Sequence, residues 1–258
     1  MLPPGRYDSH VHVQHGADIR PEKFRAGLKA AGIAGCALFS EDPDPAGTLA
    51  PKPAPPEEAI DNLFRWIDGA ENIFPFYWIN PTAPEACDLV DLALSKGIMG
   101  FKVLPGTFYP GDPRALPVYR KIAHLGLICV FHAGMDVAFP PPCPCSPERI
   151  ARALPAFDGS PVVAAHFGGY MMWQEALSAY KGTGIYLDTS YSHSRVIMPL
   201  ARELVQMAGT DHLLFGSDAP WSDPAREAMA VHCLGLSPEE EKMVFCDNAR
   251  RLLGLNLS

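Results

Sequence analysis

The residues of this 258-residue chain that could carry chemistry begin near its start, in Asp8-Ser9-His10-Val11-His12. Side chains alternate between the two faces of a β-strand, so His10 and His12 point to the same side if this segment is extended. They would lie about 6–7 Å apart along the strand, close enough for both imidazoles to bind one metal ion. The pair alone indicates little, but further residues of metal-ligand type recur along the chain.

Three of these later residues each end a short apolar run and begin a loop. They are His132 in Val-Phe-His-Ala-Gly, His166 in Ala-Ala-His-Phe-Gly-Gly and Asp218 in Phe-Gly-Ser-Asp-Ala-Pro. Neutral imidazole suits Zn²⁺, Mn²⁺ or Fe²⁺, and a carboxylate completes such a set. Three or four protein ligands with one open position are typical of a catalytic metal site. The pattern therefore predicts one divalent ion, Zn²⁺ in the first place and Mn²⁺ or Fe²⁺ as alternatives.

The chemistry expected of this set is the activation of water. A divalent ion lowers the pKa of a bound water towards about 7, which creates a nucleophile at neutral pH. Asp218 could bind the ion and also accept the proton of that water. His166 could be a further ligand, or it could polarise a substrate and shuttle protons. Asp218 and His166 are therefore the expected catalytic residues.

Short apolar runs alternate along the chain with longer amphipathic stretches, which predicts parallel strands with crossover helices. The predicted strands are Tyr7–Val13, Gly35–Phe39, Phe74–Ile79, Gly100–Leu104, Leu127–His132, Pro161–His166, Gly184–Asp188 and His212–Gly216. The predicted helices are Pro21–Ala31, Pro56–Gly69, Ala83–Lys96, Ala115–His124, Pro147–Leu154, Met171–Lys181, Val196–Met207 and Ser237–Leu253.

Eight such units favour an α/β fold of the (β/α)8 TIM-barrel type, with residues 1–258 forming a single domain. An open doubly wound sheet is the rival architecture, but it would carry a glycine-rich loop after its first strand, and none follows here. In a barrel the loops after the strands meet at one end. The five candidate residues, although distant in sequence, would all lie at the C-terminal ends of the strands.

Two proline-rich segments are expected on the same rim. Residues 43–56 contain six prolines and follow the second predicted strand, so we interpret them as a loop flanking the pocket. The segment Phe139–Pro147 follows the fifth strand and contains Cys143-Pro144-Cys145. A second metal or redox site is one interpretation of the two thiols. One intervening residue is tighter than the usual metal pair, so we favour a loop that merely holds them.

Composition limits the partners. The formal net charge of −8 argues against nucleic acid or an anionic membrane, and no apolar run is long enough to span a bilayer. The seven scattered cysteines and the absence of an apolar signal segment in Met1–Arg6 predict a cytoplasmic protein. We expect a small-molecule substrate. Barrels of this kind often pair, so a homo-oligomer is left open.

The chain resembles the amidohydrolase superfamily, and more closely its branch of amidohydrolase-related proteins that includes aminocarboxymuconate-semialdehyde decarboxylase. The resemblance covers nearly the whole chain. It rests on Asp8–His12, Gly100-Phe101-Lys102, His132-Ala133-Gly134, His166–Gly169, Tyr186–Ser190, Phe215–Pro220 and Asn248–Gly254. It implies His10, His12, His132 and Asp218 as ligands of one divalent ion, with His166 as the catalytic histidine beside them.

Lys102 is the first departure that matters. Binuclear members of the superfamily use a carboxylated lysine from the fourth strand, so a second metal near Lys102 and His166 is conceivable. We expect an unmodified lysine near the pocket instead. The second departure is length, since related decarboxylases are usually longer. Their substrate-carboxylate arginine cannot be located, and Arg195 and Arg25 are unsupported candidates.

Other residues around the expected site have two interpretations. Trp221 and Tyr170 directly follow site residues, and they either line the substrate pocket or pack. His193 follows the seventh strand and might contact substrate, although a solvent-facing loop histidine is favoured. Asp188 ends the seventh strand and is predicted to hold a site histidine by a hydrogen bond.

Three functions fit this sequence. The first is a metal-dependent hydrolase in which activated water attacks an ester, lactone or amide carbonyl, with His166 or Lys102 stabilising the oxyanion. The second is a metal-dependent non-oxidative decarboxylase on the same scaffold. The third, a non-catalytic metal-binding barrel, is disfavoured because no member of the residue set looks lost.

Overall fold

Eight parallel strands form one sheet in which the order across the sheet equals the order along the chain. The computed structural model describes residues 2–13, 20–43, 54–137, 139, 141–193 and 195–255. The strands are β1 (Arg6–His12), β2 (Ile33–Phe39), β3 (Ile73–Trp78), β4 (Gly100–Val103), β5 (Ile128–Phe131), β6 (Val162–Ala164), β7 (Tyr186–Asp188) and β8 (Leu213–Leu214).

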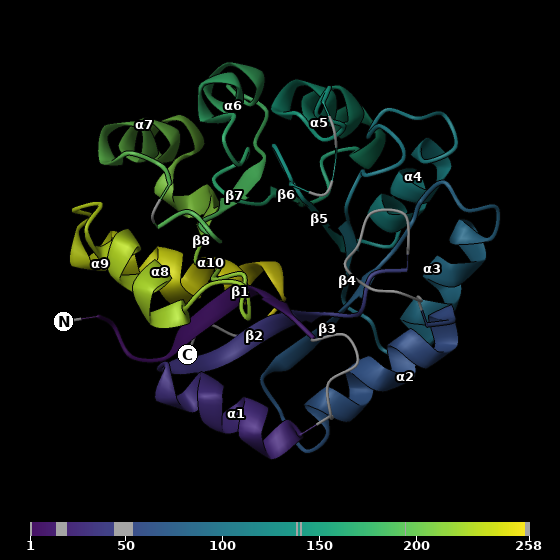
Figure 1. Ribbon diagram of the computed structural model, residues 1–258, viewed down its shortest axis with the longest axis horizontal. Coiled ribbons are helices and arrows are strands. Elements are labelled where there is room, and N and C mark those ends of the chain that lie inside the picture. The colour runs from purple at the N-terminus through teal and green to yellow at the C-terminus, as the bar shows by residue number, and fades with distance from the viewer. Residues whose placement is uncertain are drawn as a thin grey trace.

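Helices connect consecutive strands and surround them on the outside (Figure 1). The seven crossover helices are α1 (Pro21–Ala30), α2 (Pro56–Ile67), α3 (Ala86–Ser95), α4 (Leu116–His124), α5 (Pro147–Ala153), α6 (Trp173–Ala179) and α7 (Met198–Ala208). Short 3-10 turns follow α5 at Leu154–Phe157 and α7 at Thr210–His212. After β8 come α8 (Pro224–His232), α9 (Pro238–Lys242), a π-helical turn at Met243–Asp247 and α10 (Asn248–Leu252).

The first strand closes the sheet against the segment that follows the last one. The amide of Ser9 donates to the carbonyl of Phe215, and the amide of His12 donates to the carbonyl of Ala219, each at 2.8 Å. The amide of Asp218 donates back to the carbonyl of His10 at the same distance. The predicted (β/α)8 barrel is therefore confirmed, and its closing seam runs directly through the candidate metal site.

Both faces of the strands are buried, as their nearly continuous apolar sequences predict. Phe39 and Phe76 belong to a cluster inside the barrel, whereas their neighbours Leu38 and Tyr77 pack in the layer between strands and helices. This alternation follows from the two-residue period of a strand. Proline at the first turn begins many of the helices, since its missing N–H is not needed there and its φ is already helical.

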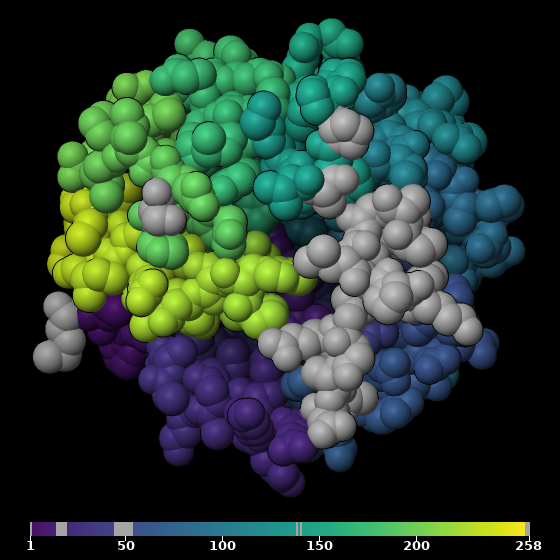
Figure 2. Space-filling model, in the orientation of Figure 1, coloured from purple at the N-terminus to yellow at the C-terminus, as the bar shows by residue number. Residues whose placement is uncertain are grey.

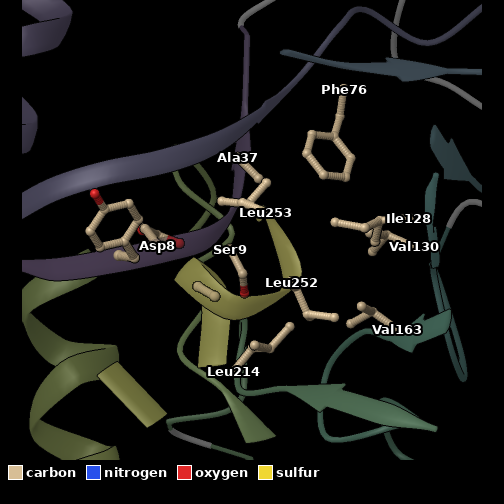
Figure 3. A pocket seen from close by; sticks show the side chains of 12 residues that line it. Asp8, Ser9, Ala37, Phe76, Ile128, Val130, Val163, Leu214, Leu252 and Leu253 are labelled. Atoms are coloured by element: carbon tan, nitrogen blue, oxygen red, sulfur yellow. The ribbon is translucent and has the colours of Figure 1, made fainter. Parts of the chain in front are cut away.

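The end of the barrel opposite the candidate site is filled by apolar side chains. A cavity of about 30 Å³ remains there, lined by residues that include Ile128, Val130 and Val163. Leu252 and Leu253 of the C-terminal segment point towards these strand residues (Figure 3). The C-terminal segment thus closes this end, which leaves the other end as the place for chemistry.

The C-terminal region differs from the prediction. The predicted single helix Ser237–Leu253 is interrupted by the π-helical turn, which leaves the carbonyl of Val244 to accept a hydrogen bond from the amide of Phe215 at 3.0 Å. Helix α8 was missed, although Asp223 before Pro224 is a helix-start signal and its carboxylate accepts from the amide of Ala225.

Several strands end earlier than predicted. β6 ends at Ala164 and β8 at Leu214, because the residues that follow turn sharply out of the sheet. Of the proline-rich segment 43–56, residues 44–53 lie outside the described residues, so its predicted position beside the pocket stays a prediction. Among the described helices, none combines the length and the apolar character needed to cross a membrane.

Candidate metal centre and active site

Three side chains from opposite ends of the chain converge at the top of the barrel. His10 Nε2 lies 3.1 Å from His12 Nε2, and each of these atoms lies 3.3 Å from Asp218 Oδ1. All three residues are buried. Because β1 carries both histidines on its inner face and the loop after β8 carries the carboxylate, closure of the barrel itself brings them together.

The triangle formed by these three atoms has the size that a small divalent ion requires. Four ligand atoms arranged tetrahedrally at about 2.0–2.1 Å from an ion lie about 3.3 Å from one another. The three observed separations, 3.1, 3.3 and 3.3 Å, match that edge. Two imidazoles and one carboxylate also suit Zn²⁺ or Mn²⁺. His10, His12 and Asp218 therefore form a group that could hold a divalent metal.

Asp188 fixes the orientation of His10. Its Oδ2 accepts a hydrogen bond from His10 Nδ1 at 2.8 Å, and both side chains are fully buried. The other oxygen, Oδ1, accepts from the amides of His166 and Ser190 at 3.0 Å each and from the hydroxyl of Ser190. Because His10 donates through Nδ1, its Nε2 keeps the lone pair that a metal needs. The predicted role of Asp188 in holding a site histidine is confirmed.

His132 and His166 form a second pair beside the triangle. His166 Nε2 lies 3.1 Å from His132 Nδ1, and His166 Nδ1 lies 3.1 Å from the carbonyl of Ser190. A carbonyl only accepts, so His166 Nδ1 carries the proton and His166 Nε2 accepts from His132 Nδ1. His132 Nε2 is then left with a lone pair, and it has no hydrogen-bond partner among the described residues.

Burial keeps both imidazoles neutral. It lowers the pKa of His166 well below its ordinary value, with His132 adding to the effect. It also lowers the pKa of His132 to about 4, although Asp136 opposes the shift. His132 was expected as a fourth ligand, but the close group contains only the two histidines of β1 and Asp218. Its participation in metal binding stays a prediction.

Lys102 lies in the same interior, on β4. Its Nζ is 3.1 Å from His10 Nε2 and 5.1 Å from the centre of the Phe39 ring, and the side chain is 2% exposed. Burial lowers its pKa to about 8, although the carboxylates of Asp188 and Asp218 oppose the shift. An ammonium group here repels a metal held by His10, so metal binding favours the neutral amine. Its expected place near the pocket agrees with this geometry.

Asp218 combines burial with an unusual backbone. Its φ of 66° lies in the left-handed region, which aspartate tolerates better than most residues. His166 has a similar φ of 60°. Burial raises the pKa of Asp218 well above its ordinary value, while Lys102 lowers it. A cation at the triangle would therefore be needed to keep this buried carboxylate ionised at neutral pH.

A cavity of about 460 Å³ opens above these residues. Figure 2 shows this face of the barrel, with a hollow near its centre. The floor of the cavity contains His10, His12, Lys102, His132, His166 and Asp218. Its walls contain Asp42, Trp78, Leu104, Met135, Asp136, Val137, Tyr170, Tyr191, Arg195 and Trp221. Such a volume suits a small molecule.

The structure separates the weaker pocket candidates. Trp221 and Tyr170 line the cavity, and the Trp221 ring meets the His12 ring edge-on at 4.6 Å between centres. His193 does not line it, because its Nδ1 lies 2.8 Å from the buried carboxylate of Glu227. Of the two arginines, Arg195 lines the cavity, whereas Arg25 is bonded to the carbonyl of Asp68 on the outside.

Sequence reasoning missed several residues of the cavity wall. Trp78 ends β3, Asp42 follows β2 and Tyr191 follows β7. Their positions at strand ends were a usable signal, because the rim of a barrel is built from such residues. No metal-ligand pattern distinguished them, which is why a search for ligand types passed over them.

The fold is a barrel with a buried group that could hold a divalent metal, and the sequence identifies its family independently. The family model described as amidohydrolase matches residues 7–255, so the chain belongs to the amidohydrolase family. Comparison with curated protein sequences finds no significant match.

Solved structures of both reaction classes share the fold. A putative 2-pyrone-4,6-dicarboxylic acid hydrolase from Pseudomonas putida is 17% identical, with a TM-score of 0.71 and 100% of each chain covered. 2,6-Dihydroxybenzoate decarboxylase from Rhizobium is 14% identical, with a TM-score of 0.69, covering 98% of this chain and 99% of that one. A zinc-bound amidohydrolase from Burkholderia multivorans is 15% identical, with a TM-score of 0.70 and coverages of 98% and 100%.

Proposed function

We propose that this protein is a metal-dependent hydrolase that acts on an ester, lactone or amide bond of a small molecule. The observation that carries the proposal is the triangle of His10 Nε2, His12 Nε2 and Asp218 Oδ1 on the floor of a cavity of about 460 Å³. A divalent ion held there would supply Lewis-acid chemistry, polarising a carbonyl and lowering the pKa of a water molecule.

The residues of the chain divide the remaining work. Asp218 lies at the cavity floor and accepts the proton of the attacking water. His132 lines the cavity floor, and His166 holds the tautomer of His132 by accepting from its Nδ1. His166 thus positions His132, and His132 moves a proton to or from the substrate. This assignment differs from the one implied by the resemblance, which gives the catalytic role to His166.

The charged side chains that line the cavity favour a substrate with an anionic group. Arg195 on the wall is cationic and suits a carboxylate, and the amine of Lys102 on the floor can donate a hydrogen bond to a developing oxyanion. Asp42 and Asp136 lie on other parts of the wall and would repel an anion placed beside them. Trp78, Tyr170 and Trp221 supply apolar area around the reacting bond.

A panel of lactones, esters and amides with and without a carboxylate, followed by proton release, tests this proposal. Zn²⁺-loaded and Mn²⁺-loaded protein should hydrolyse at least one anionic member, and His12→Ala should abolish the activity. His193→Ala is the matched control, because His193 lies outside the cavity and should leave the rate within about twofold. Metal uptake without turnover on any panel contradicts the proposal.

The second candidate is a metal-dependent decarboxylase of an aromatic acid. The aromatic walls support it, since Trp78 and Trp221 flank His12 with ring centres 5.4 and 4.6 Å away, a setting suited to a planar ring. Release of CO₂ from hydroxybenzoates, with no hydrolysis of the first panel, would favour this reaction over hydrolysis.

A further inference from the structure

Two thiols in the loop after β5 meet at one backbone oxygen. Cys143 Sγ lies 2.9 Å and Cys145 Sγ 3.2 Å from the carbonyl oxygen of Gly134. The two sulfur atoms therefore lie beside one another at the same acceptor. Cys143 is half-buried and reachable from solvent, whereas Cys145 is fully buried. The tight spacing that makes Cys143-Pro144-Cys145 unsuitable for a common metal motif therefore places both sulfurs against one oxygen.

We propose that Cys143 and Cys145 form an oxidation site that a hydroperoxide converts into a Cys143–Cys145 disulfide. Cys143 is the attacking thiol because it is accessible, and Cys145 is the resolving thiol because its sulfur lies against the same carbonyl oxygen. The site is separate from the metal triangle, and its existence does not depend on the function proposed above.

The reaction balances with the hydroperoxide as its only oxidant. Cys143 attacks the hydroperoxide, an S–O bond forms as the O–O bond breaks, and hydroxide or alkoxide leaves. The sulfur of Cys143 loses two electrons and becomes a sulfenic acid. Cys145 then attacks this sulfur, the S–S bond forms, the S–O bond breaks, and the departing hydroxide takes the proton of Cys145 as water.

Local interactions favour attack by Cys143. The hydrogen bond from Cys145 lowers the pKa of Cys143 from 9.0 to about 7, and Arg149 contributes in the same direction. Burial, the bond with Cys143 and its charge together raise the pKa of Cys145. When Cys143 ionises it can no longer donate to Gly134, so the S–H of Cys145 becomes its hydrogen-bond partner. Ionisation thus draws the two sulfurs together.

The expected gain in rate is modest. A thiol with a pKa of 7 has about 50 times more thiolate at pH 7 than one with a pKa of 9, but its lower basicity reduces the intrinsic rate about eightfold. Cys143 should therefore react about sixfold faster than an ordinary thiol. Removing the donor with Cys145→Ala should abolish this advantage, and Cys145→Ser, which keeps a donor, should restore most of it.

The site lies against the wall of the main cavity. The carbonyl of Gly134 accepts hydrogen bonds from both thiols, and its amide donates to the carbonyl of Cys145 at 2.9 Å. The next residue, Met135, belongs to the cavity wall. The amide of Met135 donates to Tyr170, another wall residue, at 2.8 Å. A disulfide has no S–H group, so oxidation removes both thiol hydrogen bonds to the carbonyl of Gly134. The backbone beside this cavity wall thereby loses two contacts, and reduction restores them.

Mass spectrometry after peroxide treatment and alkylation tests the proposal on the full chain. Cleavage after Lys121 and Arg149 yields one peptide that contains Cys129, Cys143 and Cys145. Oxidation should remove two hydrogens from this peptide and leave only Cys129, which is buried, open to alkylation after unfolding. Cys145→Ser should stop at a sulfenic acid that a dione reagent traps, and Cys143→Ser should leave Cys145 unreactive. A dithiol reductant should reverse the change.

Several results would overturn it. Direct formation of sulfinic acid at Cys143 in the unsubstituted protein would show that Cys145 cannot resolve the intermediate. Equal rates at Cys143 in the Cys145→Ala and Cys145→Ser variants would remove the role of the donor. A bound metal ion lost in the Cys143→Ser variant, with Cys143 protected until chelation, would make the pair a metal site instead. Circular dichroism of each variant verifies that the fold is kept.

Discussion

Asp188→Asn should weaken metal binding although Asp188 touches no metal-ligand atom. The substitution keeps the shape of the side chain and replaces one oxygen by an amide. Oδ1 accepts from two amides and a hydroxyl, so the single oxygen of asparagine will stay there. The NH₂ group must then face His10 Nδ1, where the carboxylate accepted a hydrogen bond at 2.8 Å. His10 can meet this donor only by moving its own proton to Nε2.

The magnitude follows from the lost ligand. A proton on His10 Nε2 removes one lone pair from the triangle, and carboxylate partners of metal-binding histidines typically contribute 10–100-fold in affinity. The expected increase in Kd is therefore about 10–100-fold, or about 1.4–2.8 kcal/mol. Titration of chelator-treated protein with Zn²⁺ against a chromophoric chelator measures it.

Asp211→Asn is the matched control. Asp211 also pairs with a histidine, since its Oδ1 lies 3.2 Å from His212 Nδ1, but this pair is on the surface and away from the cavity. The control should keep the original affinity. An Asp188→Asn variant that folds normally and binds Zn²⁺ as tightly as the control would refute the tautomer reasoning and, with it, the role of Asp188.

Three further outcomes follow from the same interior. Lys102→Met should flatten the rise in the stability of the metal-free protein between about pH 8 and 10. The pKa of the native lysine is lowered to about 8, so in this range the native state binds fewer protons than the unfolded chain and its stability increases with pH. Melting curves across that range measure the rise in both proteins. Glu227→Gln should lower the free energy of unfolding in urea by about 1–3 kcal/mol. The buried carboxylate accepts hydrogen bonds from two backbone amides, the ring of His193 and the hydroxyl of Ser222. An unchanged midpoint contradicts this. Trp221→Ala should raise KM more than it lowers kcat for whichever panel substrate is turned over, since this half-exposed ring lines the cavity and supplies apolar area to the substrate. A loss confined to kcat contradicts it.

The sequence predicted the fold because its signals are local and repeated. Each strand is a short apolar run and each crossover is an amphipathic stretch, so eight units could be counted without any knowledge of contacts. Where the prediction of helices failed, the cause was a contact between segments distant in the sequence. The π-helical turn exists because Phe215 needs the carbonyl of Val244, and no local pattern announces that bond.

The candidate site was predictable to the level of residues but not of contacts. His10, His12 and Asp218 could be found because each is of ligand type and lies in or just after a short apolar run. The pairing of His132 with His166 accompanies a left-handed backbone at His166, which no sequence pattern predicts. The engagement of His193 by Glu227, 34 residues later, depends on the packing of α8, a helix that the sequence reading missed.

The position of the ligands at the closing seam has a thermodynamic consequence. β8 has only two residues, and the closure to β1 rests on the backbone bonds of Ser9, His12 and Asp218. A metal ion bound to His10, His12 and Asp218 would cross-link both sides of this seam. Ligand binding at 100 times Kd should stabilise the native state by about 2.7 kcal/mol.

That stabilisation should be concentrated at the seam. Amide hydrogen exchange with and without Zn²⁺ distinguishes a local cross-link from a global effect. The amides of Ser9, His12 and Asp218 should gain more protection than the amide of Ile79, which donates to Lys102 between β3 and β4 on another side of the barrel. Equal gains at all four amides would mean that the barrel opens only as a whole, and the seam would then not be the place where the metal acts on stability.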